Sequence, residues 1–227
     1  GTGKTYTAAE IIYRLLKSKT AKRILFLVDR RALAAQAVGA FASFQPEPTQ
    51  RLDKLYEIYS QKFRKDDLEE GFDPDVLPNE YLTDPKSNHT FVYVSTIQRM
   101  RINLFGQSGM FSWSGDEDIE DEAEKLDIPI HAFDVIIADE CHRGYTSSEQ
   151  SKWREVLDHF DAIQIGLTAT PAKHTTGHFR NVVYHYPVEK AVMDGYLADW
   201  ALITVESGIR MEGLFLNQGE DVQYIDP

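Results

Sequence analysis

Hydrophobic residues in the N-terminal part of the chain follow two different periodicities. Those at positions 8, 11, 12, 15 and 16 are three or four apart, which predicts an amphipathic helix that starts near residue 4 and ends in the basic stretch 17–22. Residues 23–29 are apolar almost throughout, which is typical of a strand buried on both faces of a parallel sheet. The alanine-rich residues 30–44 predict a second helix.

The alternation of strand and helix patterns continues through the rest of the chain. Further strand-like apolar runs cover residues 91–96, 133–138, 162–167, 182–186 and 201–205. Residues 97–104 and 151–160 predict helices. Because strands that alternate with helices favour a parallel sheet covered on both faces, we expect an α/β fold of three layers with a mostly parallel sheet.

Two segments depart from this pattern. Residues 45–90 are charged and rich in tyrosine and proline, and we interpret them as an insertion that is helical near residues 52–63 and then a loop. Residues 106–130 hold eight acidic residues and one lysine, a net charge of −7, and predict a long solvated loop. Because such a charge repels phosphates, we expect this acidic segment to face solvent or protein partners and not DNA.

Composition narrows the class of protein. The 227 residues are 42% hydrophobic and 26% charged, which fits a globular protein of one domain, or of one domain and part of a second. The net charge of −12 does not mark a nucleic-acid-binding protein, although local patches matter more than the total. The single cysteine, Cys141, favours a cytoplasmic location, and no apolar run approaches the roughly 20 residues that span a membrane.

A glycine-rich segment opens the first predicted helix. Gly1, Thr2, Gly3, Lys4 and Thr5 match the end of the phosphate-binding pattern G-x-x-x-x-G-K-[ST]. Gly3 lets backbone amides close around a phosphate, and the helix that follows adds the positive end of its dipole. Lys4 can then reach the outer phosphates of a nucleotide, and the Thr5 hydroxyl can bind Mg²⁺. A glycine turn before an ordinary amphipathic helix is the alternative interpretation.

Two further motifs follow predicted strands, at the end of an α/β sheet where ligands bind. Asp139 and Glu140 come directly after the strand at 133–138; Asp139 can hold Mg²⁺, and Glu140 can take a proton from an attacking water. Thr168 and Thr170 follow the next strand, where hydroxyl groups can hydrogen-bond the neighbouring acids. Taken alone, the acids also fit a helix cap, and the threonines also fit a turn closed by proline.

Together, the three motifs resemble the first motor domain of superfamily 2 helicases and translocases, with a phosphate loop, a DECH box and a Thr-Ala-Thr motif. Residues 26–33, 95–98, 165–176 and 191–197 narrow the resemblance to the motor (R) subunit of type I restriction enzymes. This resemblance implies a RecA-like P-loop NTPase fold, ATP with Mg²⁺, and translocation on double-stranded DNA in complex with modification and specificity subunits. It also implies that His142, Thr168 and Thr170 couple the nucleotide site to movement along DNA.

The resemblance further implies DNA contacts and domain boundaries. The candidate DNA contacts are Arg30, Arg31, Thr96 and Gln98. The arginines would hold phosphates without reading sequence. Residues 1–186 would form the motor domain, and residues 187–227 a connector toward a second motor domain. Because the strand before the phosphate loop would precede Gly1, we expect the chain to be part of a longer one. Because a hydrolysis site of this kind is shared with the second motor domain, we expect this segment to bind nucleotide weakly and to hydrolyse ATP poorly by itself.

Two other functions fit some of these residues. Another superfamily 2 DNA or RNA helicase would share the three motifs, and a nucleotide-gated binding scaffold without turnover would share the phosphate loop. Intact Lys4, Asp139 and Glu140 argue against the scaffold.

The remaining candidates carry less chemistry. His174, His178 and His185 have no cysteine or acid at zinc-binding spacing, and we expect them to be solvated. We expect Cys141 to be a small buried residue behind the acids and not a nucleophile.

Overall fold

The computed structural model describes residues 3–68, 72–106, 123–142 and 147–199. The chain divides into two units, residues 1–185 and 186–227, and each is described by itself. Within the described part of the chain, no helix combines the length and the apolar character needed to cross a membrane.

The first unit is built on a five-stranded sheet in the order β2-β3-β1-β4-β5. The strands are β1 (Arg23–Val28), β2 (Glu57–Ser60), β3 (Phe91–Thr96), β4 (Val135–Asp139) and β5 (Ile163–Leu167). All neighbouring strands are parallel. The register sets Thr96 beside Val28 and Leu167 beside Asp139, so the carboxyl ends of these strands lie along one edge of the sheet.

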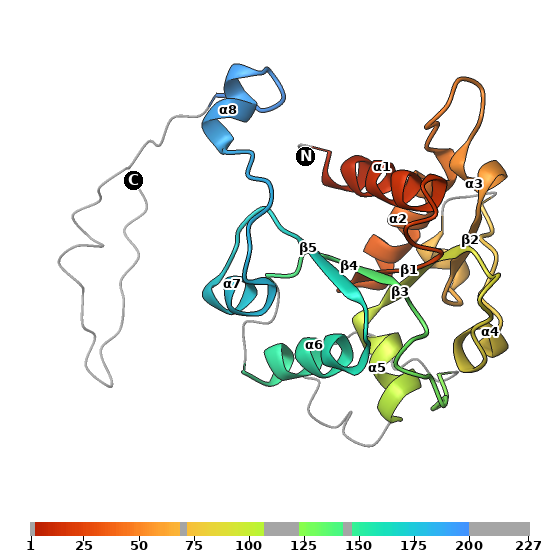
Figure 1. Ribbon diagram of the computed structural model, residues 1–227. Helices are drawn as coiled ribbons and strands as arrows, with labels where there is room; N and C mark the ends of the chain where they lie inside the picture. The colour runs from red at the N-terminus through yellow and green to blue at the C-terminus, as the bar shows by residue number, and fades with distance from the viewer. Residues whose placement is uncertain (1–2, 69–71, 107–122, 143–146, 200–227) are drawn as a thin grey trace, which may run out of the picture. The chain divides into compact units, whose positions relative to one another are not determined.

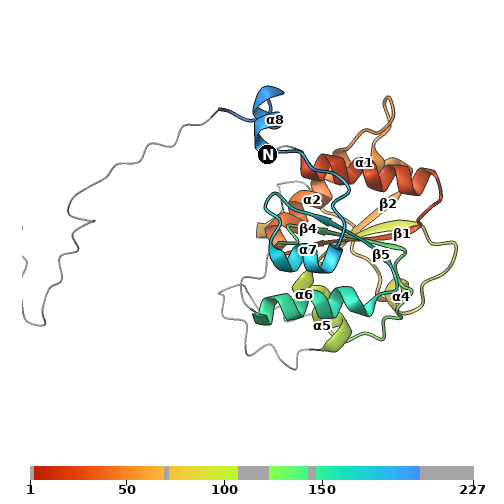
Figure 2. The ribbon, with the colours of Figure 1, turned by 60° about the vertical axis from the view of Figure 1, so that its left-hand side comes forward.

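Helices cover both faces of this sheet (Figures 1 and 2). Helices α1 (Lys4–Lys17) and α2 (Arg31–Ser43) pack on one face, and α5 (Ile97–Phe105) and α6 (Ser147–His159) pack on the other. Side chains alternate along β1: Ile24, Phe26 and Val28 join the core under α1 and α2, whereas Leu25 and Leu27 join the core with α5 and α6. The expected three-layer α/β fold with a parallel sheet is confirmed.

Short elements complete the two units. They are α3 (Leu52–Leu55), the 3₁₀ turn η1 (Lys65–Asp67), α4 (Asn79–Thr83) and α7 (Lys173–Phe179) in the first unit, and α8 (Val188–Met193) in the second.

The insertion at 45–90 differs from its prediction. The expected helix at 52–63 ends at Leu55, and Glu57–Ser60 instead form β2, which pairs with β3 at one side of the sheet. Hydrogen bonds offered by the edge of β3 outweigh the local helical pattern. Residues 182–186, expected as a strand, have no regular secondary structure, and Val183 is 90% exposed. The predicted strand at 201–205 and most of the acidic segment lie outside the described residues.

Candidate nucleotide-binding site

The described residues of the predicted phosphate loop stand at the start of helix α1. Gly3 has a φ of 83°, in the left-handed region where a side chain would be strained. Gly3, the N-cap residue, has no side chain that could cap this end of α1, and the first turn holds no acidic residue. The first amide groups of the helix therefore suit an anion. Lys4 and Thr5 are half-buried at this helix end, while Gly1 and Thr2 lie outside the described residues.

The chain makes a tight turn over residues 139–142, here named the DECH turn, where β4 ends. Glu140 has a φ of 51°, an uncommon conformation for a residue with a side chain. Its amide donates to Asp139 Oδ1 at 2.9 Å, and the Cys141 amide donates to the Leu167 carbonyl at 3.1 Å. The first bond lies within the turn, and the second holds the turn against the end of β5.

The DECH turn and the phosphate loop meet through an ion pair. Lys4 Nζ lies 2.9 Å from Glu140 Oε1, and the two side chains are 30% and 23% exposed. Two residues that are far apart in the sequence are therefore in contact, as expected of groups at the carboxyl ends of a parallel sheet.

Burial controls the protonation of the neighbouring groups. It raises the pKa of Asp139, the Glu140 charge adds to this rise, and Lys4 and His142 partly oppose it. A cation bound at Asp139 would offset the same penalty. Burial also raises the pKa of Cys141 to about 12, so its thiol stays protonated. Cys141 is 8% exposed, which confirms the expectation of a small buried residue.

The Thr-Ala-Thr motif reaches Glu140 through His142. Thr168 Oγ1 lies 2.7 Å from His142 Nδ1, and the same nitrogen lies 3.3 Å from Glu140 Oε2. Because an ionised carboxylate can only accept, this arrangement favours a proton on His142 Nδ1. Thr170 takes part through its backbone, whose amide donates to Thr168 Oγ1 at 3.1 Å, while its side chain is exposed.

The side-chain oxygens at this site suit Mg²⁺ better than they suit a metal ion bound by protein groups alone. Among the described residues, no group of three or more His, Cys, Asp or Glu side chains could hold a metal ion. Mg²⁺ is commonly bound by one or two protein oxygens and completed by phosphates and water. The half-buried carboxylate of Asp139 and the hydroxyl of Thr5 fit that requirement.

Two of the three histidines are not solvated as expected. His174 Nε2 lies 3.0 Å from the His142 carbonyl oxygen, and His178 Nε2 lies 2.7 Å from Gln164 Oε1. Both are half-buried because α7 packs back onto the end of the sheet, whereas His185 is exposed as expected. The spacing of Thr175, His178 and Phe179 by three and four is the sequence signal that could have indicated a packed helix face.

The candidate DNA contacts flank the ends of β1 and β3. Arg30 is exposed and its Nε lies 3.6 Å from Asp29 Oδ2, while Arg31 Nη1 lies 3.8 Å from Asp67 Oδ2. Gln98 is half-buried in the first turn of α5. Arg30 and Arg31 thus stay compatible with a surface role, whereas Gln98 Oε1 is buried and has no hydrogen-bond partner among the described residues.

Thr96 differs from the expectation of a DNA contact. It is 1% exposed, and its hydroxyl accepts the Arg99 amide at 3.1 Å as the N-cap of α5. The buried side chain of Gln61 accepts the Thr96 amide at 2.7 Å and the Ser95 hydroxyl at 3.2 Å. Sequence analysis missed Gln61, which comes from the insertion and orients the start of α5.

Comparison with known proteins assigns the family. Residues 1–173 match the family described as Type III restriction enzyme, res subunit. The chain belongs to this family of restriction-enzyme subunits. It is 34% identical over 243 residues to the type I restriction enzyme EcoKI endonuclease subunit of Escherichia coli strain K12, and 33% identical over 232 residues to the EcoAI endonuclease subunit of Escherichia coli. The expected resemblance to type I restriction subunits is confirmed.

These relatives are much longer than this member of the family. The alignments cover 100% and 97% of this chain but 18% and 22% of the two relatives, so the chain spans about a fifth of their length.

Among solved structures, a nuclease-deletion mutant of the Type ISP restriction-modification enzyme LlaGI, in complex with a DNA substrate mimic, has a TM-score of 0.53 at 20% identity. That match covers 86% of this chain and 18% of LlaGI, and it supports the RecA-like fold.

Proposed function

We propose that this chain is the ATP-binding domain of a motor that translocates along double-stranded DNA as part of a type I restriction endonuclease subunit. The observation that carries the proposal is the continuous line of contacts from Lys4 through Glu140 and His142 to Thr168. Family membership and the type I relatives support the restriction context, with modification and specificity subunits as the proposed partners.

Each residue of this line has a proposed part in hydrolysis. Lys4 leaves Glu140 and binds the outer phosphates of ATP, while the first turn of α1 cradles them. Asp139 and Thr5 hold Mg²⁺, which neutralises phosphate charge when bound. Glu140, released from Lys4, accepts a proton from the attacking water. Catalysis of this kind rests on positioning and charge, with no covalent intermediate on the protein.

His142 and Thr168 orient Glu140 through the carboxylate oxygen that Lys4 does not contact. The His142 imidazole contacts the second carboxylate oxygen, and the Thr168 hydroxyl contacts the imidazole. Any change in the charge or position of Glu140 therefore alters the contacts of the Thr-Ala-Thr segment. We propose that this segment passes the state of the nucleotide on to the DNA contacts, with Arg30, Arg31 and Gln98 holding the duplex.

The test is ATPase activity of the longest native chain that contains this segment, measured with no nucleic acid, RNA, single-stranded DNA and long duplex DNA. The proposal expects stimulation by duplex DNA, strongest with the partner subunits present, and loss of turnover in Glu140→Gln. Stimulation by RNA or single strands would instead indicate another superfamily 2 helicase. Nucleotide binding without turnover under every condition would indicate a binding scaffold.

A further inference from the structure

Helix α7 contacts the DECH turn through two backbone oxygens. His174 Nε2 lies 3.0 Å from the His142 carbonyl oxygen, and Thr175 Oγ1 lies 3.4 Å from the Cys141 carbonyl oxygen. A carbonyl oxygen only accepts, so His174 must carry its proton on Nε2 and the Thr175 hydroxyl must donate. Two consecutive residues of α7 therefore hold the two carbonyls that directly follow Glu140.

Close packing fixes α7 in this place. A Cβ atom on Gly166 of β5 would lie 2.8 Å from Cys141 Sγ and 2.9 Å from Phe179 Cε2, so only glycine lets α7 approach this closely. His178 is bound to Gln164 Oε1 at 2.7 Å, and Gln164 Nε2 donates to the Leu157 carbonyl of α6 at 2.8 Å.

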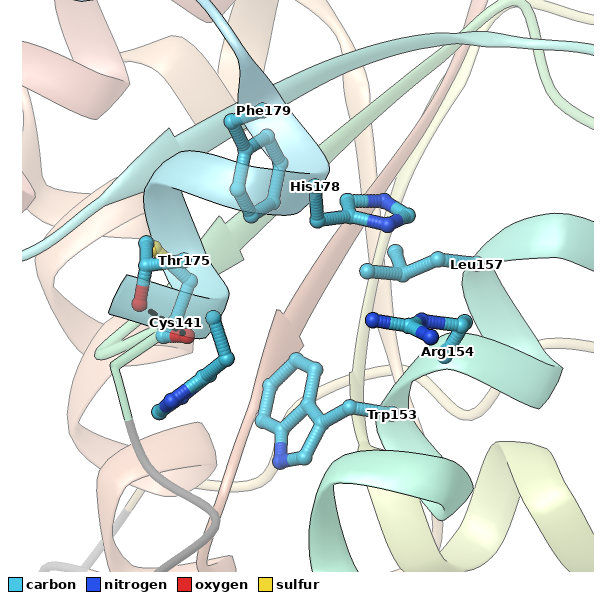
Figure 3. A pocket seen from close by; sticks show the side chains of 8 residues that line it. Cys141, Trp153, Arg154, Leu157, Thr175, His178 and Phe179 are labelled. Carbon is cyan, nitrogen blue, oxygen red and sulfur yellow. Dashed lines mark hydrogen bonds between the residues drawn. The ribbon is translucent and has the colours of Figure 1, made fainter. Parts of the chain in front are cut away.

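Figure 3 shows the contact between α7 and the DECH turn from close by. Thr175 is joined to Cys141 at one side of a small pocket, and Trp153, Arg154 and Leu157 of α6 line the other side. Thr175 is 6% exposed, so its hydroxyl has little access to water as an alternative partner.

We propose that His174 and Thr175 are positioning residues for Glu140. Glu140 holds a left-handed backbone conformation, which a residue with a side chain keeps only when its surroundings impose it. The donors of α7 contribute to it by anchoring the carbonyls of Cys141 and His142, while the Cys141 amide is held by the Leu167 carbonyl. The inference rests on the proposed function, because the position of Glu140 matters most when its carboxylate must meet a water at the γ-phosphate.

Paired variants in the longest native chain separate the effect of the two hydrogen bonds from the effect of side-chain packing in α7. Thr175→Val and His174→Ala remove the donors, whereas Thr175→Ser and His174→Gln keep one. Thr176→Val is the matched control, because the Thr176 hydroxyl is exposed and, among the described residues, bonds only the carbonyls of Lys173 in its own helix and of the N-cap residue Ala172. The readouts are kcat for duplex-stimulated ATP hydrolysis, Kd for Mg·ATP, and the midpoint of thermal unfolding.

The inference expects kcat to fall about tenfold or more in Thr175→Val and His174→Ala, because a displaced general base loses its geometry. The Kd should not rise more than about twofold, because Lys4 and the phosphate loop are untouched. Thr175→Ser and His174→Gln should recover most of kcat, and Thr176→Val should match the parent. Should Thr175→Val fail to fold, the pair at the half-buried His174 carries the same test.

Three results would overturn the inference, and they differ from one another. An active parent whose donor-less variants keep kcat within twofold refutes the inference alone. Equal losses of kcat in the donor-less and donor-keeping variants, in step with a lower unfolding midpoint, show that α7 is only structural. A parent that binds ATP but never hydrolyses it refutes the proposed function and the inference together.

Discussion

Glu140→Gln should weaken hydrolysis and strengthen nucleotide binding at the same time. Removing a general base of this kind costs about 10²- to 10⁴-fold in rate. Lys4 must leave its 2.9 Å ion pair with Glu140 before it can bind phosphate, and the side chains are only 30% and 23% exposed. A pair at this depth contributes about 1 kcal/mol, the upper end for pairs near the surface. Without that competition, the Kd for Mg·ATP should fall about fivefold.

The substitution is well matched to its site. Glutamine has the size of glutamate and the same cost at a φ of 51°, so the DECH turn should keep its fold. Glu155→Gln is the control, because Glu155 of α6 pairs with Arg101 of α5 at 3.3 Å, on the face of the sheet opposite α1. Titration with a fluorescent ATP analogue gives Kd, and single-turnover hydrolysis gives the rate. The gain in affinity should shrink as salt rises, because screening already weakens the pair in the parent.

The result that would refute this reasoning is equally specific. If Glu140→Gln bound Mg·ATP more weakly than the parent at low salt, Lys4 would not be competing for phosphate in the way the ion pair indicates. If it hydrolysed ATP within threefold of the parent, Glu140 would not be the base. Either result would leave the fold and the family assignment intact, because neither depends on the role of this side chain.

Three further predictions test the surroundings of the site. Asp134→Ala should lower the free energy of unfolding by about 2 kcal/mol, because Asp134 accepts hydrogen bonds from Arg23 Nη2 at 3.0 Å and from two backbone amides. An unchanged midpoint in a urea titration would contradict this. Burial lowers the pKa of His178 below 6.5 in the folded chain, so the unfolded chain binds this proton at a higher pH than the folded chain does. The contribution of His178 to the free energy of unfolding should be complete above pH 6.5 and be lost as pH falls through the lower pKa of the folded chain. This loss should be absent in His178→Gln. Cys141 should react slowly with iodoacetamide and faster in Phe179→Ala, and a fast-reacting parent would be inconsistent with its burial.

The strands that leave an apolar run in the sequence could be predicted, including β5 at one edge of the sheet, whereas β2 at the other edge could not. β1, β3 and β4 are apolar on both faces because helices cover both, and that burial leaves a continuous apolar run in the sequence. β2 has only one neighbour and a mixed pattern, so its conformation depends on pairing with β3. A local pattern carries no information about such a partner.

The same distinction applies to the candidate site. Lys4 and Glu140 could be placed together because motifs at the carboxyl ends of parallel strands share one edge of the sheet. The contacts of His174, Thr175 and Gln61 could not be foreseen, because they involve backbone groups or a side chain from an insertion. Any residue supplies a carbonyl oxygen, so a bond to one leaves no pattern in the sequence around it.

The anchoring of the DECH turn has a consequence for how the proposed motor would couple its two sites. The backbone after Glu140 is held on both sides, by Leu167 of β5 and by Thr175 of α7. When Lys4 exchanges Glu140 for phosphate, the backbone therefore has little room to move, and the change must be taken up by the side chains of Glu140 and His142. The Thr168 hydroxyl contacts the imidazole directly, so under the proposed function the first group to respond to ATP is the Thr-Ala-Thr segment. Thr168→Val should accordingly leave ATP binding close to the parent value but reduce the stimulation of hydrolysis by duplex DNA, and full stimulation in this variant would rule out this route.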